Sequence, residues 1–166
     1  MPPSNSTLRE LADKHRLSYP RLCGVMTGYS EPKTEWRPRV DTGNPARLQR
    51  IAELKELISE AKKHYERSKN NGNGIFILDQ LIQAGREYLK VATTGEEFAW
   101  LAEQIPPESA TFNQLIEKWD DCMIFCIRQM ETIEEIVQAY HSSPRGGGAQ
   151  DYALYRIVQI TLEDSE

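Results

Sequence analysis

Residues 111–141 decide the fold, and they read TFNQLIEKWDDCMIFCIRQMETIEEIVQAYH. Apolar residues recur there in alternating steps of four and three, which is the repeat of a helix that buries one face. The seam consists of Phe112, Ile116, Trp119, Met123, Cys126, Met130, Ile133, Val137 and Tyr140, widened by Leu115, Ile124, Phe125, Ile127 and Ile136. We therefore predict one long helix over 111–141 at the centre of a bundle, with an end that pairs with a second copy in a homodimer.

Helical patterns also precede and follow this seam. Asn44 is a good N-cap, and Pro45 occupies the first helical position, where its missing N–H has no cost. That helix is expected to end at the Asn/Gly-rich turn 70–74. Further helices are predicted over 75–92, from a capping box at Thr94 to about Glu103, and over 151–162. The last segment is the least regular, because its alternating apolar residues also fit a strand.

The N-terminal part has shorter elements. Residues 8–15 and 19–26 each suit a brief helix, with Ser6 or Thr7 as the first N-cap. Residues 29–44 contain two prolines and a glycine without a helical period, which is typical of a linker. The predicted organisation is therefore a tail (1–5), a head (6–29), a basic linker (30–43) and an acidic body (44–166). The fold class is all-α, with a small N-terminal head joined to a four- or five-helix bundle that contains one long heptad-patterned helix.

Composition sets limits on location. The chain has 166 residues, of which 39% are hydrophobic and 27% charged, as in globular proteins. No stretch approaches the roughly 18 consecutive apolar residues of a membrane helix. The first residues lack the basic, apolar and small-residue succession of a signal peptide. Three cysteines, Cys23, Cys122 and Cys126, show no disulfide-like spacing, so we expect a reduced cytoplasmic setting without a membrane.

Charge is distributed unevenly along the chain. The net charge is −5, yet residues 1–50 carry nine Lys/Arg against five Asp/Glu, and residues 51–166 carry eleven against twenty. The first part is therefore +4 and the remainder −9. Such asymmetry is compatible with a head that touches nucleic acid on an acidic body.

Residues 8–27 carry a recognisable pattern. Ala12 is the small residue at which a second helix can cross the first, and Ser18 can cap that second helix. Apolar residues that fill the angle between the helices are Leu8, Leu11, Leu17, Leu22 and Val25. The stretch resembles the helix-turn-helix of phage-repressor type, although Arg16 stands where that family usually has Gly.

The resemblance implies binding to duplex DNA. Ser18, Tyr19, Pro20 and Arg21, with Gly24 further along, would face the major groove. The cations expected to contact phosphates are Arg9, Arg16, Arg21, Lys33, Arg37 and Arg39, and Trp36 would lie among them on a phosphate-contacting arm. Two alternatives stay open: an ordinary helical hairpin packed on the bundle, and a loop whose tryptophan packs onto the core.

Other residue groups suggest chemistry less strongly. Cys122 and Cys126 lie four apart, but a metal would need further ligands such as His64 or His141, and cysteines at apolar positions usually behave as small hydrophobes. Glu117-x-x-Asp120 and Glu131-x-x-Glu134 resemble magnesium-binding pairs but lie on one predicted helix. The run 146–148 is interpreted as a hinge. We expect no enzyme activity, no metal and no cofactor.

The sequence thus predicts a small DNA-binding regulator or accessory factor that dimerises through its helical body. The alternative is a helical protein–protein interaction adaptor that does not bind nucleic acid. A third possibility is a magnesium-dependent nucleotide hydrolase, which would require two chains to pair their acidic faces.

Overall fold

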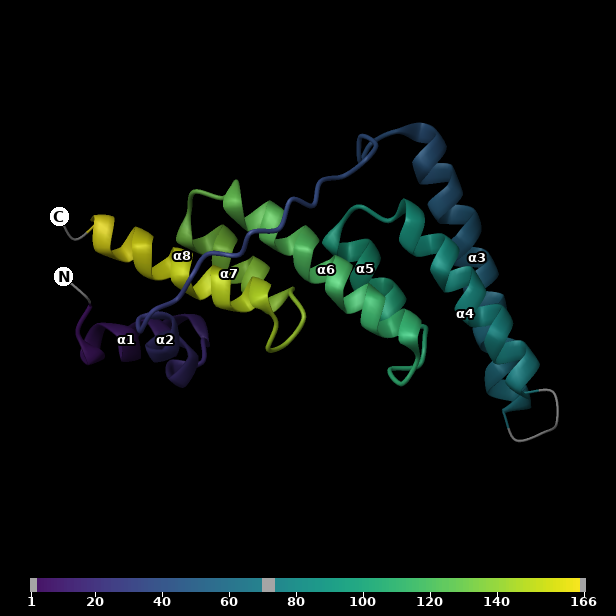
Figure 1. Ribbon diagram of the computed structural model, residues 1–166, viewed down its shortest axis with the longest axis horizontal. Helices are drawn as coiled ribbons and strands as arrows, with labels where there is room; N and C mark the ends of the chain where they lie inside the picture. Colours follow the sequence, from purple (N-terminus) through teal and green to yellow (C-terminus); the bar gives the residue numbers. More distant parts are fainter. Residues whose placement is uncertain (1–2, 70–73, 165–166) are drawn as a thin grey trace. The chain divides into compact units, whose positions relative to one another are not determined.

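The computed structural model describes residues 3–69 and 74–164, and within these ranges it contains eight helices and no strand (Figure 1). The prediction of an all-α fold is confirmed. The helices are α1 (Asn5–His15), α2 (Tyr19–Val25), α3 (Pro45–Ser68), α4 (Gly74–Val91), α5 (Gly95–Ala102), α6 (Ala110–Arg128), α7 (Ile133–His141) and α8 (Gly148–Asp164).

The helices group into two compact units. One contains the described residues up to Trp36 together with those from Asp120 onward, and the other contains Arg37–Trp119. The division falls within α6. It differs from the predicted head and body, because α2 packs against α8 rather than forming a separate domain. The N-terminal hairpin is therefore part of the unit that the later part of α6, α7 and α8 complete.

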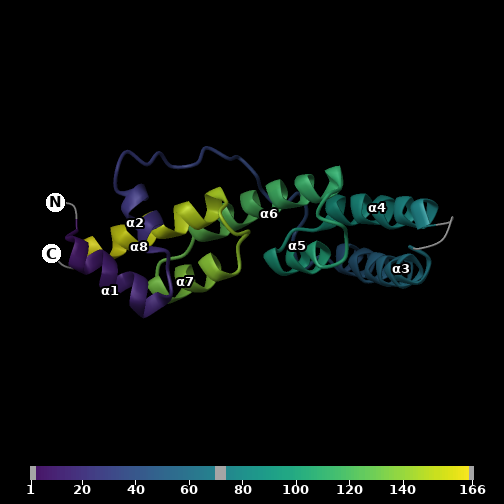
Figure 2. The same cartoon turned by 90° about the horizontal axis from the view of Figure 1, so that it is seen from below.

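The unit of residues 37–119, called unit 2 below, is based on the paired helices α3 and α4 (Figures 1 and 2). Asn44 caps α3 by accepting hydrogen bonds from the amides of Ala46 and Arg47, and Pro45 is its first residue, as predicted. Most of the predicted turn 70–74 lies outside the described residues. The fully or nearly fully buried apolar side chains of this unit include Ile51, Leu54, Ile58, Leu81, Tyr88, Phe98, Leu101 and Leu115.

The other unit, called unit 1, contains the paired helices α7 and α8 (Figure 2). Its core includes Leu22, Ile127, Ile136, Leu154 and Ile157, all of which are fully buried. The predicted helix over 151–162 is confirmed as part of α8. Its apolar residues alternate locally, but Leu154, Ile157 and Val158 share one buried helical face.

The prediction of one continuous helix over 111–141 is wrong. The helix α6 ends at Arg128, and α7 begins at Ile133 after Thr132, whose hydroxyl accepts a hydrogen bond from the amide of Glu135 at 3.3 Å. A threonine three residues before a glutamate is a helix-start signal. Arg156 donates to the carbonyl of Met130, which the end of α6 leaves without a helical partner. The homodimer predicted through this segment stays a prediction.

The start of the chain also differs from the prediction of a tail over 1–5. Helix α1 begins at Asn5, and its N-cap is Ser4 rather than Ser6 or Thr7. The Ser4 hydroxyl accepts a hydrogen bond from the amide of Thr7 at 3.2 Å, which satisfies one of the free N–H groups of the first turn. Residues 1–2 of the predicted tail lie outside the described residues.

Candidate functional site

The hairpin formed by α1 and α2 has the local geometry that the sequence suggested. Arg16 adopts the left-handed conformation with φ 56° and ψ 44°, and among the described residues no other non-glycine residue has positive φ. Ser18 caps α2, and its hydroxyl accepts from the amide of Arg21 at 3.4 Å. The apolar residues expected to fill the angle between the two helices are all buried: Leu8, Leu11, Leu17, Leu22 and Val25, with Ala12 beside them.

Arg21, the cation expected to face a DNA groove, is engaged inside unit 1. Its guanidinium donates to Asp151 Oδ1 from Nη2 at 2.5 Å and from Nε at 3.1 Å. It also donates to Gln150 Oε1 at 2.6 Å and to the carbonyl of Gly147 at 3.3 Å. Arg21 thus ties α2 to the first turn of α8, and these contacts use the donors that a base or phosphate would need.

The remaining residues of the predicted DNA surface are divided between the two units. The Arg9 guanidinium lies 4.5 Å from the centroid of the Tyr19 ring, which makes a cation–π contact. The exposed members of the predicted set are Arg9, Arg16, Pro20, Lys33, Arg37 and Arg39, and Gly24 is exposed as well. Arg37 and Arg39 belong to unit 2, whereas the hairpin belongs to unit 1.

Trp36 packs onto the core of unit 1. Its ring meets Phe125 edge-on at 5.7 Å between centroids. The preceding loop is fastened by Arg128, which donates to the carbonyls of Thr34, at 3.1 Å, and of Pro32. The structure therefore matches the alternative in which this tryptophan packs onto the helices, with its side chain partly buried.

The charge asymmetry of the sequence changes sign when the two units are considered, because the unit that contains the N-terminal part is the acidic one. Residues 1–36 and 120–166 together contain eight Lys/Arg against thirteen Asp/Glu, which gives unit 1 a net charge of −5. Unit 2 contains twelve of each and is neutral. Folding with the acidic C-terminal helices thus removes the positive field that the first fifty residues suggested for a head.

Asp120 has a structural role at the start of α8. Its carboxylate accepts hydrogen bonds from the amides of Gly148 at 3.0 Å and Ala149 at 2.9 Å. Burial raises the pKa of Asp120, and these two hydrogen bonds oppose the rise. A Cβ on Gly147 would lie 2.6 Å from Asp120 Oδ1, so the glycine run allows a close approach instead of serving only as a hinge.

The described residues contain no group of three or more His, Cys, Asp or Glu side chains that could hold a metal ion. Glu117 and Asp120, one of the predicted carboxylate pairs, fall in different units. Among the described residues, none of the three cysteines forms a disulfide. A hydrogen bond with Cys122 lowers the pKa of Cys126 to about 7, while burial acts in the opposite direction.

Unit 2 contains a buried ion pair that fixes α3 against α5. Arg47 Nη1 donates to Glu97 Oε1 at 2.8 Å, and the same guanidinium donates to the carbonyls of Thr42 and Val91. Burial by itself would raise the pKa of Glu97, but hydrogen bonds from Arg47 and from the amides of Thr93 and Thr94 lower it. Because every strong donor here already has an acceptor, this junction is structural.

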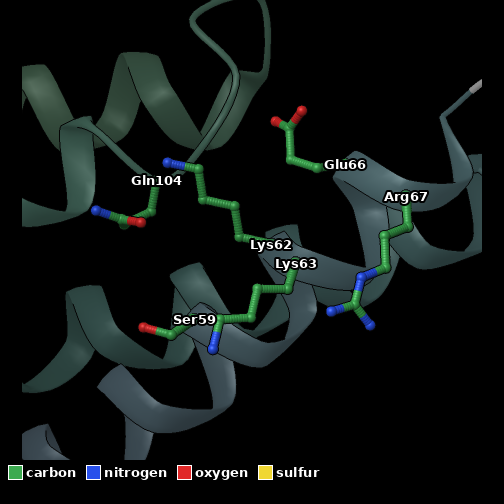
Figure 3. A pocket seen from close by; sticks show the side chains of 6 residues that line it. All are labelled: Ser59, Lys62, Lys63, Glu66, Arg67 and Gln104. Atoms are coloured by element: carbon green, nitrogen blue, oxygen red, sulfur yellow. The ribbon is translucent and has the colours of Figure 1, made fainter.

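A groove lies along the second half of α3, next to the segment that follows α5 (Figure 3). It has a volume of about 440 Å³, within the usual range of ligand clefts, and is open to solvent. Its lining residues are Ser59, Lys62, Lys63, Glu66 and Arg67 from α3 and Gln104 from the segment after α5. Figure 3 shows Lys62 extending toward Gln104, while Lys63 and Arg67 extend toward a common side and the carboxylate of Glu66 points away from Arg67.

The cations of the groove differ in their existing partners. Lys62 Nζ donates to the carbonyl of Glu103 at 2.9 Å, which ties α3 to the segment after α5. Lys63 lies 3.6 Å from Glu60, but both side chains are about two-thirds exposed, so this ion pair is weak. Arg67 has no ion-pair or hydrogen-bond partner among the described residues. Lys63 and Arg67 are therefore available to an incoming anion.

Sequence reasoning did not identify this groove. The available signal is the spacing of Ser59, Lys63 and Arg67, which places three hydrogen-bond donors along one face of a helix. That spacing is also typical of an ordinary solvated face. Gln104, which closes the groove from another segment, has no sequence relation to α3 and becomes a neighbour only through folding.

Comparisons of the chain with protein-family models, with curated proteins and with solved structures find no significant match. Among the described residues, none of the helices is both long enough and apolar enough to cross a membrane.

Proposed function

We propose that this protein is a helical adaptor that binds another protein through the groove on α3. The observation that carries the proposal is the pair of available cations, Lys63 and Arg67, beside a hollow whose walls include their own methylene stems. Long basic side chains cover apolar surface with their stems while their charged ends stay in water. Such a surface suits a peptide, which offers both methylenes and charged or polar ends.

The groove is built from fixed elements, which favours recognition. The Arg47–Glu97 pair holds the first turn of α3 against α5, and Lys62 holds a later turn against the carbonyl of Glu103. A surface that is already ordered loses less conformational freedom when a partner binds. Preorganisation of this kind supports a binding role for the groove.

Site-specific photo-crosslinking tests the proposal in the full-length protein. A benzophenone amino acid replaces Ser59 inside the groove, and the matched control places it at the exposed position of Arg50. These positions are nine residues apart, about two and a half turns, so they lie on opposite sides of α3. Irradiation in cell extract is followed by separate protease and nuclease digestion of the adducts.

The proposal expects an adduct at position 59 that protease removes and nuclease does not. Its yield should fall several-fold when Lys63→Gln and Arg67→Gln are added, and position 50 should give no such adduct. Adducts of equal yield at both positions, or adducts that only nuclease removes, contradict an adaptor that uses this groove.

DNA binding through the N-terminal hairpin is a second candidate, favoured by one observation. The left-handed turn at Arg16 and the Ser18 cap reproduce the local construction of a helix-turn-helix. Against it, Arg21 is paired with Asp151, and unit 1 is acidic. Selection from a randomised duplex pool distinguishes the two candidates, because a helix-turn-helix protein should enrich a sequence motif and the proposed adaptor should enrich none.

A further inference from the structure

We infer that the groove on α3 recognises an acidic protein segment with two carboxylates about one helical turn apart, an inference that rests on the adaptor function proposed above. Lys63 and Arg67 are four residues apart on α3, which corresponds to a rise of about 6 Å along the helix. Both side chains extend toward the same side of the groove (Figure 3). Two anionic groups with matching separation would therefore meet one cation each.

The donor types suit carboxylates. The planar guanidinium of Arg67 presents paired N–H groups that match the two oxygens of a carboxylate. Lys63 provides a compact charge one turn away, and the Ser59 hydroxyl adds a neutral donor to the lining. Gln104 closes the groove, and its amide already donates to the carbonyl of Trp100 at 3.2 Å. The matching spacing in a partner is i, i+4 on a helix, about 6 Å, or i, i+2 on an extended strand, about 6.6 Å.

The charges around the groove limit the length of the anionic segment. Glu60 and Glu66 flank Lys63, and unit 2 as a whole is neutral. A nucleic acid carries a charge at every phosphate, so a strand laid along the groove would meet the carboxylate of Glu66 in the lining and that of Glu60 beside Lys63. A protein segment with two acids among neutral residues avoids this repulsion. The arrangement therefore favours a short acidic protein segment over a polyanion.

NMR titration of the ¹⁵N-labelled full-length protein tests the inference. The probe is an alanine-rich helical peptide with two glutamates at i and i+4, and its control has glutamine at both positions. Each exposed charge pair contributes a few tenths to one kcal/mol, so the glutamate peptide should bind about tenfold more tightly. The shifted signals should belong to residues that line the groove, including the Arg67 Nε–H.

Two protein variants make the test specific. Lys63→Gln with Arg67→Gln should weaken binding of the glutamate peptide about tenfold, to the level of its glutamine control. Arg50→Gln with Lys90→Gln removes the same charge from unit 2 at exposed sites outside the groove and should leave the affinity within about twofold.

Equal affinity for the two peptides, or equal losses in the two variants, overturns the inference. Tighter binding of duplex DNA than of the glutamate peptide, lost in the Lys63/Arg67 variant, also overturns it. The photo-crosslink at position 59 distinguishes failure of the acidic partner class from failure of the adaptor function. If the protease-sensitive adduct forms but the peptides bind equally, the adaptor function stands and the acidic partner class fails, whereas absence of the adduct removes the function itself.

Discussion

Each unit contains an arginine that joins two of its own helices, and the two arginines differ in how deeply they are buried. Arg47 reaches Glu97 in the first turn of α5, and Arg21 reaches Asp151 and Gln150 in the first turn of α8. The exposed fractions of the side chains are 4% and 11% for the Arg47–Glu97 pair and 27% and 39% for the Arg21–Asp151 pair. When one partner is lost from the buried pair, the remaining charge is isolated. In the partly exposed pair, water can take the place of the lost partner. Burial, rather than contact geometry, therefore decides how much stability each arginine provides.

Arg47→Met is the substitution with the largest expected effect. It leaves the buried carboxylate of Glu97 without its main partner, and loss of one member of a buried pair destabilises by about 3–5 kcal/mol. Urea unfolding followed by circular dichroism measures the change. Arg50→Met is the matched control, because its pair with Glu53 is 3.7 Å long and about half exposed, and it should change stability by less than about 0.5 kcal/mol. Equal effects of the two substitutions would contradict the comparison.

Gly147→Ala should destabilise unit 1 by about 1–3 kcal/mol. The new methyl would lie 2.6 Å from Asp120 Oδ1, and the carboxylate has little room to move while it accepts from Gly148 and Ala149. Gly24→Ala is the control, because the space around Gly24 is open and the residue lies in α2, so alanine should be neutral or slightly stabilising. Thermal unfolding of both variants checks the prediction. A Gly147→Ala protein as stable as the Gly24→Ala protein would show that Asp120 is not fixed.

Arg21→Met should have a smaller effect than Arg47→Met, about 1–2 kcal/mol, because water partly replaces the lost donors. Hydrogen exchange should show faster opening at the start of α8 and along α2, the two segments that Arg21 joins. Exchange within unit 2 provides the internal control and should not change. A loss of stability as large as that of Arg47→Met would mean that exposure does not govern the two junctions.

Two carboxylates should make stability depend on pH in opposite directions. These effects are the smallest of those predicted. The pKa of Glu97 is lowered in the folded state, so its contribution is present above the unfolded pKa and is lost as pH falls through the folded pKa. The pKa of Asp120 is raised, so its contribution is present below the unfolded pKa and is lost as pH rises through the folded pKa. Stability should therefore fall less in acid for Glu97→Gln than for the natural chain. Urea titrations in the acidic range measure these slopes, and parallel slopes for the two proteins would contradict the role assigned to Glu97.

Much of the helical structure could be predicted from local signals. Asn44 with Pro45 and Thr94 with Glu97 mark helix starts through their own chemistry, and the structure has caps at both places. The break between α6 and α7 was missed because the apolar seam continues in step across it. Thr132 and Glu135 carried the signal of a new helix, but the heptad pattern outweighed it. Periodicity reports which residues face the core, and it does not require one continuous helix.

The candidate site was harder to predict from the sequence. Arg21 and Trp36 belong to a stretch that looks basic and exposed, and their partners Asp151 and Phe125 lie about a hundred residues later. Such long-range pairing decides which cations remain available to bind a partner. Lys63 and Arg67 have a spacing that any solvated helix face can show, and Gln104 joins them only after folding.

Fluorescence anisotropy that compares the two surfaces tests the central claim most directly. The labelled probes are the glutamate peptide and a duplex DNA pool, each titrated at several salt concentrations. The proteins are the natural chain, a groove variant (Lys63→Gln with Arg67→Gln) and a hairpin variant (Arg9→Gln with Arg16→Gln). We expect the groove variant to bind the peptide about tenfold more weakly and the hairpin variant to match the natural chain with both probes. Salt-sensitive duplex binding that the hairpin variant loses and the groove variant retains would contradict the account and identify the hairpin as a DNA-binding head.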